Sequence, residues 1–197
     1  MLKQLPNTLT LLRLVLAPVI AWAVWQAYAM AESEGQAWAV WAAILFVIAA
    51  LTDLFDGMVA RALDAHSKFG RLIDPIADKA LVGLPLIAIS IVAERVQWPL
   101  WWAIGLSTGV IVTRDVTMTW LRMTAKDGEG ARVSQLAKWK TAIELVAVAI
   151  PLVLMAAPSF ASGFVVSDAM RIAWIGFLAI AALLSAYTAF QYFTAKN

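Results

Sequence analysis

Residues 37–62 read AWAVWAAILFVIAALTDLFDGMVARA, an apolar stretch that ends in two carboxylates, Asp53 and Asp56, and an arginine, Arg61. About 20 consecutive apolar residues are enough for a helix to cross the hydrocarbon core of a bilayer. The stretch therefore predicts a membrane-spanning helix whose last turns carry charged groups. Ionisable residues in such a segment are costly and usually functional. We therefore expect the chemistry of the protein at this end of the helix.

The rest of the chain has the same apolar character. Of its 197 residues, 62% are hydrophobic and 14% are charged, and the mean hydropathy of +0.80 is far above that of soluble domains. Apolar stretches predict transmembrane helices near residues 8–30, 37–62, 72–93, 98–124, 135–157 and 165–193. These stretches leave little length for a separate soluble domain. We predict an all-α integral membrane protein with six transmembrane helices, in which residues 1–197 form a single domain.

The basic residues predict the orientation of these helices. Thirteen of the 15 Lys and Arg residues fall on one side of the predicted spans, and only Arg95 and Arg171 fall on the other. Basic residues in short loops mark the cytoplasmic side. Both termini and the loops near 63–71 and 125–134 are therefore predicted to be cytoplasmic, with residues 32–34 outside. Several tryptophans near the outer loops are expected to form an interfacial belt: Trp22, Trp25, Trp38, Trp41, Trp98, Trp101 and Trp102.

Two scarce residue types exclude several kinds of chemistry. The chain has no cysteine, so thiolate nucleophiles and cysteine metal sites are excluded. Its single histidine, His66, falls in a predicted loop and is expected to be solvated. The net charge of +2 is explained by membrane topology, and we expect no nucleic-acid partner.

Four carboxylates are expected to meet at the cytoplasmic side of the membrane. Asp53 and Asp56 share one helix face with the small residues Gly57 and Ala60. Asp74 and Asp78, four residues apart, share a face of the next predicted helix. The short loop between these two helices predicts that they pack as antiparallel neighbours, so that the two acidic pairs converge.

Such a group of carboxylates needs compensating cations. Oxygen ligands favour Mg²⁺ or Mn²⁺, and two such ions are the usual arrangement for clamping a phosphoryl centre. Gly57 and Ala60 would leave space for a ligand beside the metal, and Arg61 suits a phosphate oxygen. The alternative is that the acids form structural salt bridges with basic neighbours, namely Arg61, Lys68, Arg71 and Lys79.

The spacing of these residues resembles the signature of a known family, the CDP-alcohol phosphotransferases. Asp53-x2-Asp56-Gly57-x2-Ala60-Arg61-x8-Gly70-x3-Asp74-x3-Asp78 matches D-x2-D-G-x2-A-R-x8-G-x3-D-x3-D at every fixed position. The resemblance implies a six-helix membrane enzyme that moves a phosphatidyl group from a CDP-linked lipid to an alcohol and releases CMP. Family members are commonly dimeric, which implies a homodimer.

The resemblance also implies roles for individual residues. Asp53, Asp56, Asp74 and Asp78 would hold the metal ions, and Asp78 would also act as the catalytic base toward the acceptor hydroxyl. The CDP-lipid would be bound by Asn7, Thr10, Asp56, Gly57, Ala60, Arg61 and Gly70.

Further basic residues bear on the acceptor alcohol. Arg114, Arg122, Lys138 and Lys140 together could surround the phosphate of a small acceptor, whereas Arg114 could instead pair with Asp115 and the others could be membrane-surface anchors. Residues 6–13, 114–115, 121–122 and 133–141 resemble the bacterial phosphatidylglycerophosphate synthases. That resemblance implies CDP-diacylglycerol as the donor, sn-glycerol 3-phosphate as the acceptor and the bacterial inner membrane as the location.

Two alternatives remain open. Those synthases usually carry Glu where Asp115 stands and Gly where Ala137 stands, and an Arg-Asp pair also occurs in cardiolipin synthases, whose acceptor is phosphatidylglycerol. A small ion or proton transporter is the non-enzymatic alternative, because acids within a membrane can relay ions. A transporter would place its polar residues near the midplane, whereas these acids fall at one face.

Overall fold

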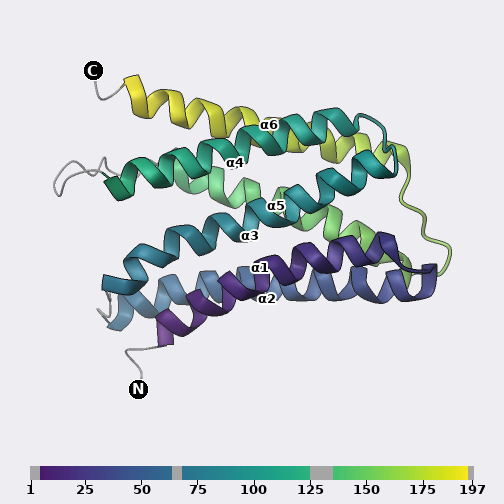
Figure 1. Cartoon of the computed structure of the whole chain (residues 1–197), viewed down its shortest axis with the longest axis horizontal. Helices are drawn as coiled ribbons and strands as arrows, with labels where there is room; N and C mark the ends of the chain where they lie inside the picture. The colour runs from purple at the N-terminus through teal and green to yellow at the C-terminus, as the bar shows by residue number, and fades with distance from the viewer. Residues whose placement is uncertain (1–4, 64–67, 125–134, 195–197) are drawn as a thin grey trace.

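The computed structural model describes the backbone of residues 5–63, 68–124 and 135–194, and the side chains of residues 8–52, 73–121, 123–124 and 139–194. These residues form six α-helices and no strand: α1 (Leu5–Ala29), α2 (Glu32–Leu63), α3 (Lys68–Arg95), α4 (Trp101–Thr124), α5 (Gln135–Ala156) and α6 (Asp168–Thr194). A short 3-10 helix, η2 (Ala157–Ser159), follows α5. The all-α, six-helix prediction is confirmed, and the helices lie side by side along the long axis of the molecule (Figure 1).

The helix boundaries match the predicted spans within a few residues, with one change at the start of α2. Residues 32–34 were expected in an external loop, but they form the first turn of α2. Only Met30 and Ala31 separate α1 from α2. Acidic side chains such as Glu32 and Glu34 are favourable at a helix N-terminus because they face the positive end of the helix dipole.

Five of the six helices are long and apolar enough to cross a membrane on composition alone. The exception is α4, although residues 98–124 were predicted as a span. Arg114, Asp115 and several Ser and Thr residues lower its hydropathy. Its 24 residues still measure about 36 Å, and it lies between α3 and α6 in the bundle (Figure 1). The polar groups of α4 therefore mark a site within the bundle.

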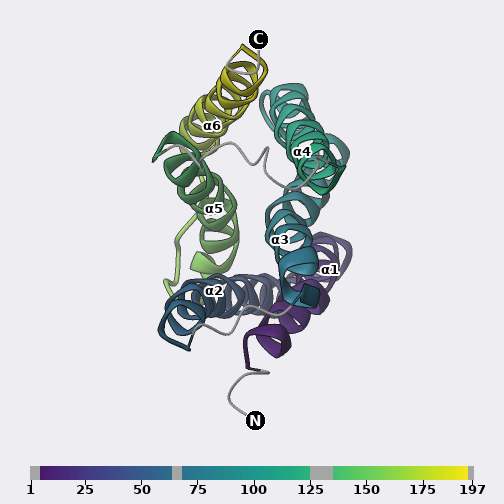
Figure 2. The ribbon, with the colours of Figure 1, turned by 90° about the vertical axis from the view of Figure 1, so that its left-hand side faces the viewer.

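The six helices pack as a closed ring. Seen end-on, the order around the ring is α1, α3, α4, α6, α5 and α2 (Figure 2). In the described residues α2 and α3 make few contacts with each other, because α1 packs against both. The expectation that α2 and α3 pack directly on each other is therefore wrong for this part of the chain. Small buried residues on α1, Ala17 and Ala23, allow its neighbours to approach closely.

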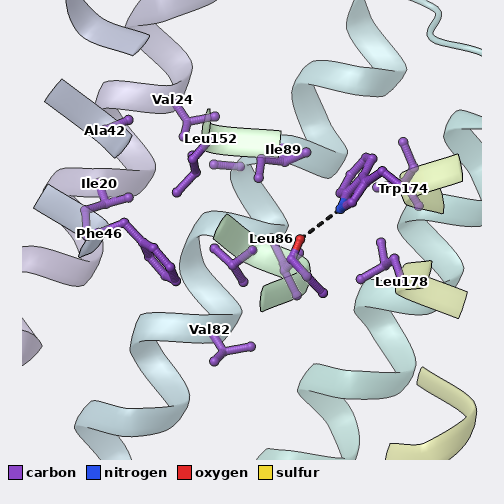
Figure 3. Close-up of a cluster of buried hydrophobic side chains, with 14 of the residues drawn as sticks. Ile20, Val24, Ala42, Phe46, Val82, Leu86, Ile89, Leu152, Trp174 and Leu178 are labelled. Atoms are coloured by element: carbon purple, nitrogen blue, oxygen red, sulfur yellow. Dashed lines mark hydrogen bonds between the residues drawn. The ribbon is translucent and has the colours of Figure 1, made fainter. Parts of the chain in front are cut away.

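A band of apolar side chains fills the middle of the ring. Ile20 of α1, Phe46 of α2, Leu86 of α3 and Leu152 of α5 meet there (Figure 3). Trp174 of α6 belongs to the same cluster, and its ring nitrogen donates to the carbonyl of Ala147 at 2.8 Å (Figure 3). Large apolar side chains also cover the outer surface of every α-helix, as expected for an integral membrane protein.

The tryptophans near the outer connections differ in exposure, and Trp25, Trp38 and Trp101 are partly buried against the core. Trp22, Trp41 and Trp102 are exposed, as expected of an interfacial belt. Trp98 is instead buried, contacts the ring of Trp174 edge-on with centroids 6.5 Å apart, and lies under the Arg171 guanidinium. The prediction for Trp98 is therefore wrong, since this residue closes the end of the apolar core.

Candidate active site

The charged residues inside the bundle gather toward one end, the charged end, where α1, α3 and α5 begin and α2, α4 and α6 finish (Figure 1). Each lies within about three turns of the helix terminus at this end. The described members are Arg13 on α1, Asp74, Asp78 and Lys79 on α3, Arg114 and Asp115 on α4, and Lys140 and Glu144 on α5. They form two clusters that share α3.

The first group, the acid cluster, consists of Thr10 and Arg13 on α1 with Asp74 and Asp78 on α3. The Thr10 hydroxyl donates to an oxygen of Asp74 at 2.5 Å, and Arg13 forms an ion pair with Asp78. Thr10 and Arg13 are buried, whereas 37% of the Asp78 side chain is exposed. Thr10 and Arg13 are three residues apart on α1, and Asp74 and Asp78 are four residues apart on α3. Each α1 side chain therefore lies opposite its own partner on α3. Helix α1 therefore orients both carboxylates, and Asp78 remains accessible.

The second group, the basic cluster, is centred on Asp115 of α4. Lys140 of α5 lies 2.5 Å from one oxygen of this carboxylate, and Arg114 lies 2.9 Å from the same oxygen. Lys79 of α3 approaches the other oxygen at 3.1 Å. A single acid thus holds cations from three helices. Because the Asp115 side chain is only 4% exposed, its charge is compensated by these neighbours and not by water.

Two further residues complete the basic cluster. Glu144, one turn after Lys140 on α5, lies 2.9 Å from the Lys140 ammonium, and both side chains are buried. On the other side, Arg114 donates to the Thr188 hydroxyl of α6 at 2.9 Å. Among the described residues, the three cations of this cluster outnumber its two carboxylates by one positive charge. The cluster therefore ties four helices together and suits an anion.

The structure brings together several of the predicted site residues. Thr10, Asp74 and Asp78 meet in the acid cluster, and Arg114 and Lys140 meet in the basic cluster. The alternative pairing of Arg114 with Asp115 is confirmed as a contact. The remaining predicted residues have side chains outside the described ones: Asn7, Asp53, Asp56, Gly57, Ala60, Arg61, Gly70, Arg122 and Lys138; His66 also lies outside.

Five residues of these clusters were not predicted as site residues from the sequence: Arg13, Lys79, Asp115, Glu144 and Thr188. Lys79 and Asp115 were considered only as ion-pair partners. Arg13 is a cation within an apolar stretch, which by itself signals an intramembrane partner. Glu144 lies four residues after Lys140, the spacing of a helical ion pair. Thr188 carried no such signal, because its partner Arg114 is 74 residues away in the sequence.

Two of the described acids could contribute to a metal site. Asp74 and Asp78 offer hard oxygen ligands one helical turn apart, a donor set that fits Mg²⁺ or Mn²⁺. Among the residues whose side chains are described, no group of three or more potential ligands could hold a metal. Asp53 and Asp56, the other two expected ligands, are outside that set.

These features define a class of protein: a helical membrane protein with oriented carboxylates beside a buried basic cluster at one end of its bundle. Comparison with known families then identifies the family to which the chain belongs. The chain matches the family described as CDP-alcohol phosphatidyltransferase over residues 3–185, and it belongs to this family.

Individual relatives extend the comparison. A protein of Cereibacter sphaeroides named CDP-diacylglycerol–glycerol-3-phosphate 3-phosphatidyltransferase is 39% identical over 149 residues, which cover 75% of this chain and 62% of that relative. A protein of Rickettsia felis with the same name is 34% identical over 196 residues, covering 98% of this chain and 95% of the relative. The chain thus spans less than two thirds of the first relative and nearly all of the second.

Proposed function

We propose that this protein is a phosphatidyltransferase of phospholipid biosynthesis, which transfers a phosphatidyl group from CDP-diacylglycerol to sn-glycerol 3-phosphate. The observation that carries the proposal is the acid cluster: Arg13 holds a partly exposed carboxylate, Asp78, beside a buried cluster with net positive charge. The names of the Cereibacter and Rickettsia relatives support the same donor and acceptor. The reaction would yield phosphatidylglycerophosphate and CMP.

Asp78 would act as the base in this reaction. The acceptor hydroxyl oxygen would form a bond to the lipid-bearing phosphorus of the donor, while its proton passes to the Asp78 carboxylate. The bond between that phosphorus and the bridging oxygen would break, and CMP would leave with the electron pair. The ion pair with Arg13 supports this role, because it fixes where the carboxylate lies.

The metal ions and the donor would occupy the same end of the bundle. We propose that Asp53, Asp56, Asp74 and Asp78 hold two divalent ions, Mg²⁺ or Mn²⁺. When bound, these ions would neutralise charge on the pyrophosphate oxygens. Leu63 and Lys68 are five residues apart, so the end of α2 and the start of α3 lie within about 18 Å of each other. The CDP-lipid would be held by Asn7, Thr10, Asp56, Gly57, Ala60, Arg61 and Gly70.

The basic cluster would receive the phosphate of the acceptor. We propose that Arg114 and Lys140 contribute from the described part of the site, and Arg122 and Lys138 from outside it. Arg114 and Lys140 already pair with Asp115, so a bound phosphate would add to an existing network. The unbalanced positive charge of the cluster supports an anionic acceptor.

The location and assembly of the protein are further parts of the proposal. The five apolar helices make it an integral membrane protein. We propose that it lies in the bacterial inner membrane as a single-domain homodimer, with both termini and the active site on the cytoplasmic side. Protease accessibility of tags placed at either terminus of the protein in inside-out vesicles would test the orientation. Cross-linking in mild detergent would test the dimer.

A labelled-acceptor assay tests the proposed reaction directly. Purified protein would receive CDP-diacylglycerol and Mg²⁺ or Mn²⁺, with either radiolabelled glycerol 3-phosphate or phosphatidylglycerol, and both CMP and the lipid product would be followed. Label from glycerol 3-phosphate entering lipid is the expected result. Product formed only with phosphatidylglycerol would replace the proposal with cardiolipin synthesis. Absence of CMP release under all conditions would contradict both.

A further inference from the structure

A groove on the outer surface of the bundle leads away from the proposed reaction site and shares one residue, Arg114, with the acceptor site proposed above. It lies between α4 and α6, which are neighbours in both ribbon views (Figures 1 and 2), and has a volume of about 650 Å³. This volume is within the range of ligand pockets, about 300–1,000 Å³. Most of the lining is apolar, including Leu106, Val110, Met118 and Phe193. Leu106 and Phe193 are exposed on the lipid-facing side, so the groove opens toward the bilayer.

Two glycines form part of the α4 wall of this groove. Gly105 and Gly109 are exposed and four residues apart, and a Cβ built on either one would meet no atom within 4 Å. Any other side chain at these positions would project into open space along the groove. The glycines therefore leave a channel in which an alkyl chain can lie against the helix backbone.

Arg114 is the charged residue in the lining of this groove, with Thr113 and Thr117 beside it. It lines the groove, and its side chain is nine-tenths buried. Its two terminal nitrogens donate to Asp115 and Thr188, but its buried Nε has no hydrogen-bond partner among the described residues. A buried donor without a partner is unfavourable. This atom is enclosed, so a ligand oxygen would approach the part of the Arg114 side chain that lines the groove.

The depth of Arg114 in the bundle indicates which lipid atoms could reach it. Arg114 is ten residues from the last residue of α4, Thr124, and Asp78 is ten residues from the first residue of α3, Lys68. At 1.5 Å per residue, both lie about 15 Å from the charged end. A lipid phosphate at the level of the acid cluster is therefore also at the level of Arg114.

We propose that the groove between α4 and α6 binds an anionic phospholipid, with one acyl chain along Gly105 and Gly109 and a phosphate oxygen at Arg114. The apolar walls fit the acyl chain, and the net positive charge of the basic cluster fits the anionic phosphate. The site is built from α4 and α6 and shares Arg114 with the proposed acceptor site, whereas the proposed donor and metal residues lie on α1, α2 and α3.

Lipid retention tests this site without relying on enzyme activity. Full-length protein in mild detergent would be equilibrated with phosphatidylglycerol or with zwitterionic phosphatidylcholine, washed, and analysed by native mass spectrometry. Wild type is expected to retain phosphatidylglycerol in preference to phosphatidylcholine. Gly109→Leu fills the groove and is expected to reduce retention of phosphatidylglycerol, because the acyl chain loses van der Waals contact with the α4 backbone.

Gly176→Leu is the matched control. Gly176 is an exposed glycine of α6 with open space around its Cβ, and it does not line the groove. Its replacement is expected to leave lipid retention unchanged. Arg114→Met keeps the groove apolar and is expected to remove the preference for the anionic lipid.

Several results would overturn the assignment. Equal retention of the two lipids by wild type, or unchanged phosphatidylglycerol retention in Gly109→Leu, would contradict it. A change in oligomeric state in Gly109→Leu with unchanged lipid retention would show that the groove is an interface between copies. Selective retention of phosphatidylglycerol by a protein that releases no CMP would support this site and contradict only the proposed reaction.

Discussion

Helix α3 carries residues of two charged clusters that lie at a similar depth but differ in their access to solvent. In the acid cluster, Asp78 is more than one-third exposed and pairs with the buried Arg13. In the basic cluster, Asp115, Lys140 and Glu144 are almost fully enclosed and compensate one another. A partly exposed carboxylate can take up a ligand or a proton with little rearrangement. Enclosed ions depend on each other, because removal of one leaves the others unpaired.

The comparison predicts that the largest effect on catalysis comes from the acid cluster. Asp78→Asn removes the proposed base and should lower the rate of CMP release by about 10²- to 10⁴-fold. The amide can still accept a hydrogen bond from Arg13, but it leaves this buried guanidinium without the charge of Asp78, so thermal stability should also fall. Asp168→Asn, an exposed acid at the start of α6, is the control and should leave the rate unchanged. Full activity of Asp78→Asn would contradict the mechanism.

The basic cluster should instead show its largest effect in stability. Lys140→Met leaves Glu144 without its 2.9 Å partner and removes one of the cations around Asp115, so the free energy of unfolding should fall by about 3–5 kcal/mol. Thermal unfolding in detergent measures this loss. The double variant Lys140→Met with Glu144→Gln should recover part of the stability, because no charge is then left unpaired at position 144. The pairing would be contradicted if the double variant lost the sum of the stabilities lost by Lys140→Met and by Glu144→Gln alone.

Most of the fold was predictable because membrane helices are encoded locally. Apolar runs of about 20 residues predicted all six helices within a few residues, including α4 with its polar centre. The packing order was less predictable. A short connection predicted contact between α2 and α3, whereas α1 packs against both in the described residues. Hydropathy shows which residues enter the membrane but not which helices touch.

The candidate site was also predictable only in part. Asp74 and Asp78 could be placed on one helix face because they are four residues apart, and the family signature implied that they are metal ligands. Arg13 was assigned only to topology, since basic residues near a membrane surface have that role in any membrane protein. Its partner Asp78 is 65 residues away in the sequence. Contacts of this kind follow from tertiary packing and not from spacing.

A smaller effect is expected for Arg114, which borders both the basic cluster and the groove between α4 and α6. Arg114→Ala should raise the KM for glycerol 3-phosphate by about 10- to 100-fold, the value of a charged hydrogen bond, with less change in the KM for CDP-diacylglycerol. Steady-state kinetics with each substrate varied in turn measures the difference. An equal rise in both constants would indicate that Arg114 only maintains the structure around Asp115 and Thr188.

The smallest effect is expected for the hydroxyl that orients Asp74. Thr10→Val keeps the size of the side chain but removes the 2.5 Å hydrogen bond to the carboxylate, at a cost of about 1.5 kcal/mol, the lower end for a bond to a charged group, since Asp74 is partly exposed. If Asp74 takes part in holding the donor, the KM for CDP-diacylglycerol should rise by about two- to tenfold, and Thr10→Ser should restore it. Because Arg13 still fixes Asp78 in this variant, kcat should fall much less than in Asp78→Asn. A KM that is equally raised in the Ser and Val variants would mean that the methyl group of Thr10, and not its hydroxyl, is what α1 contributes at this position.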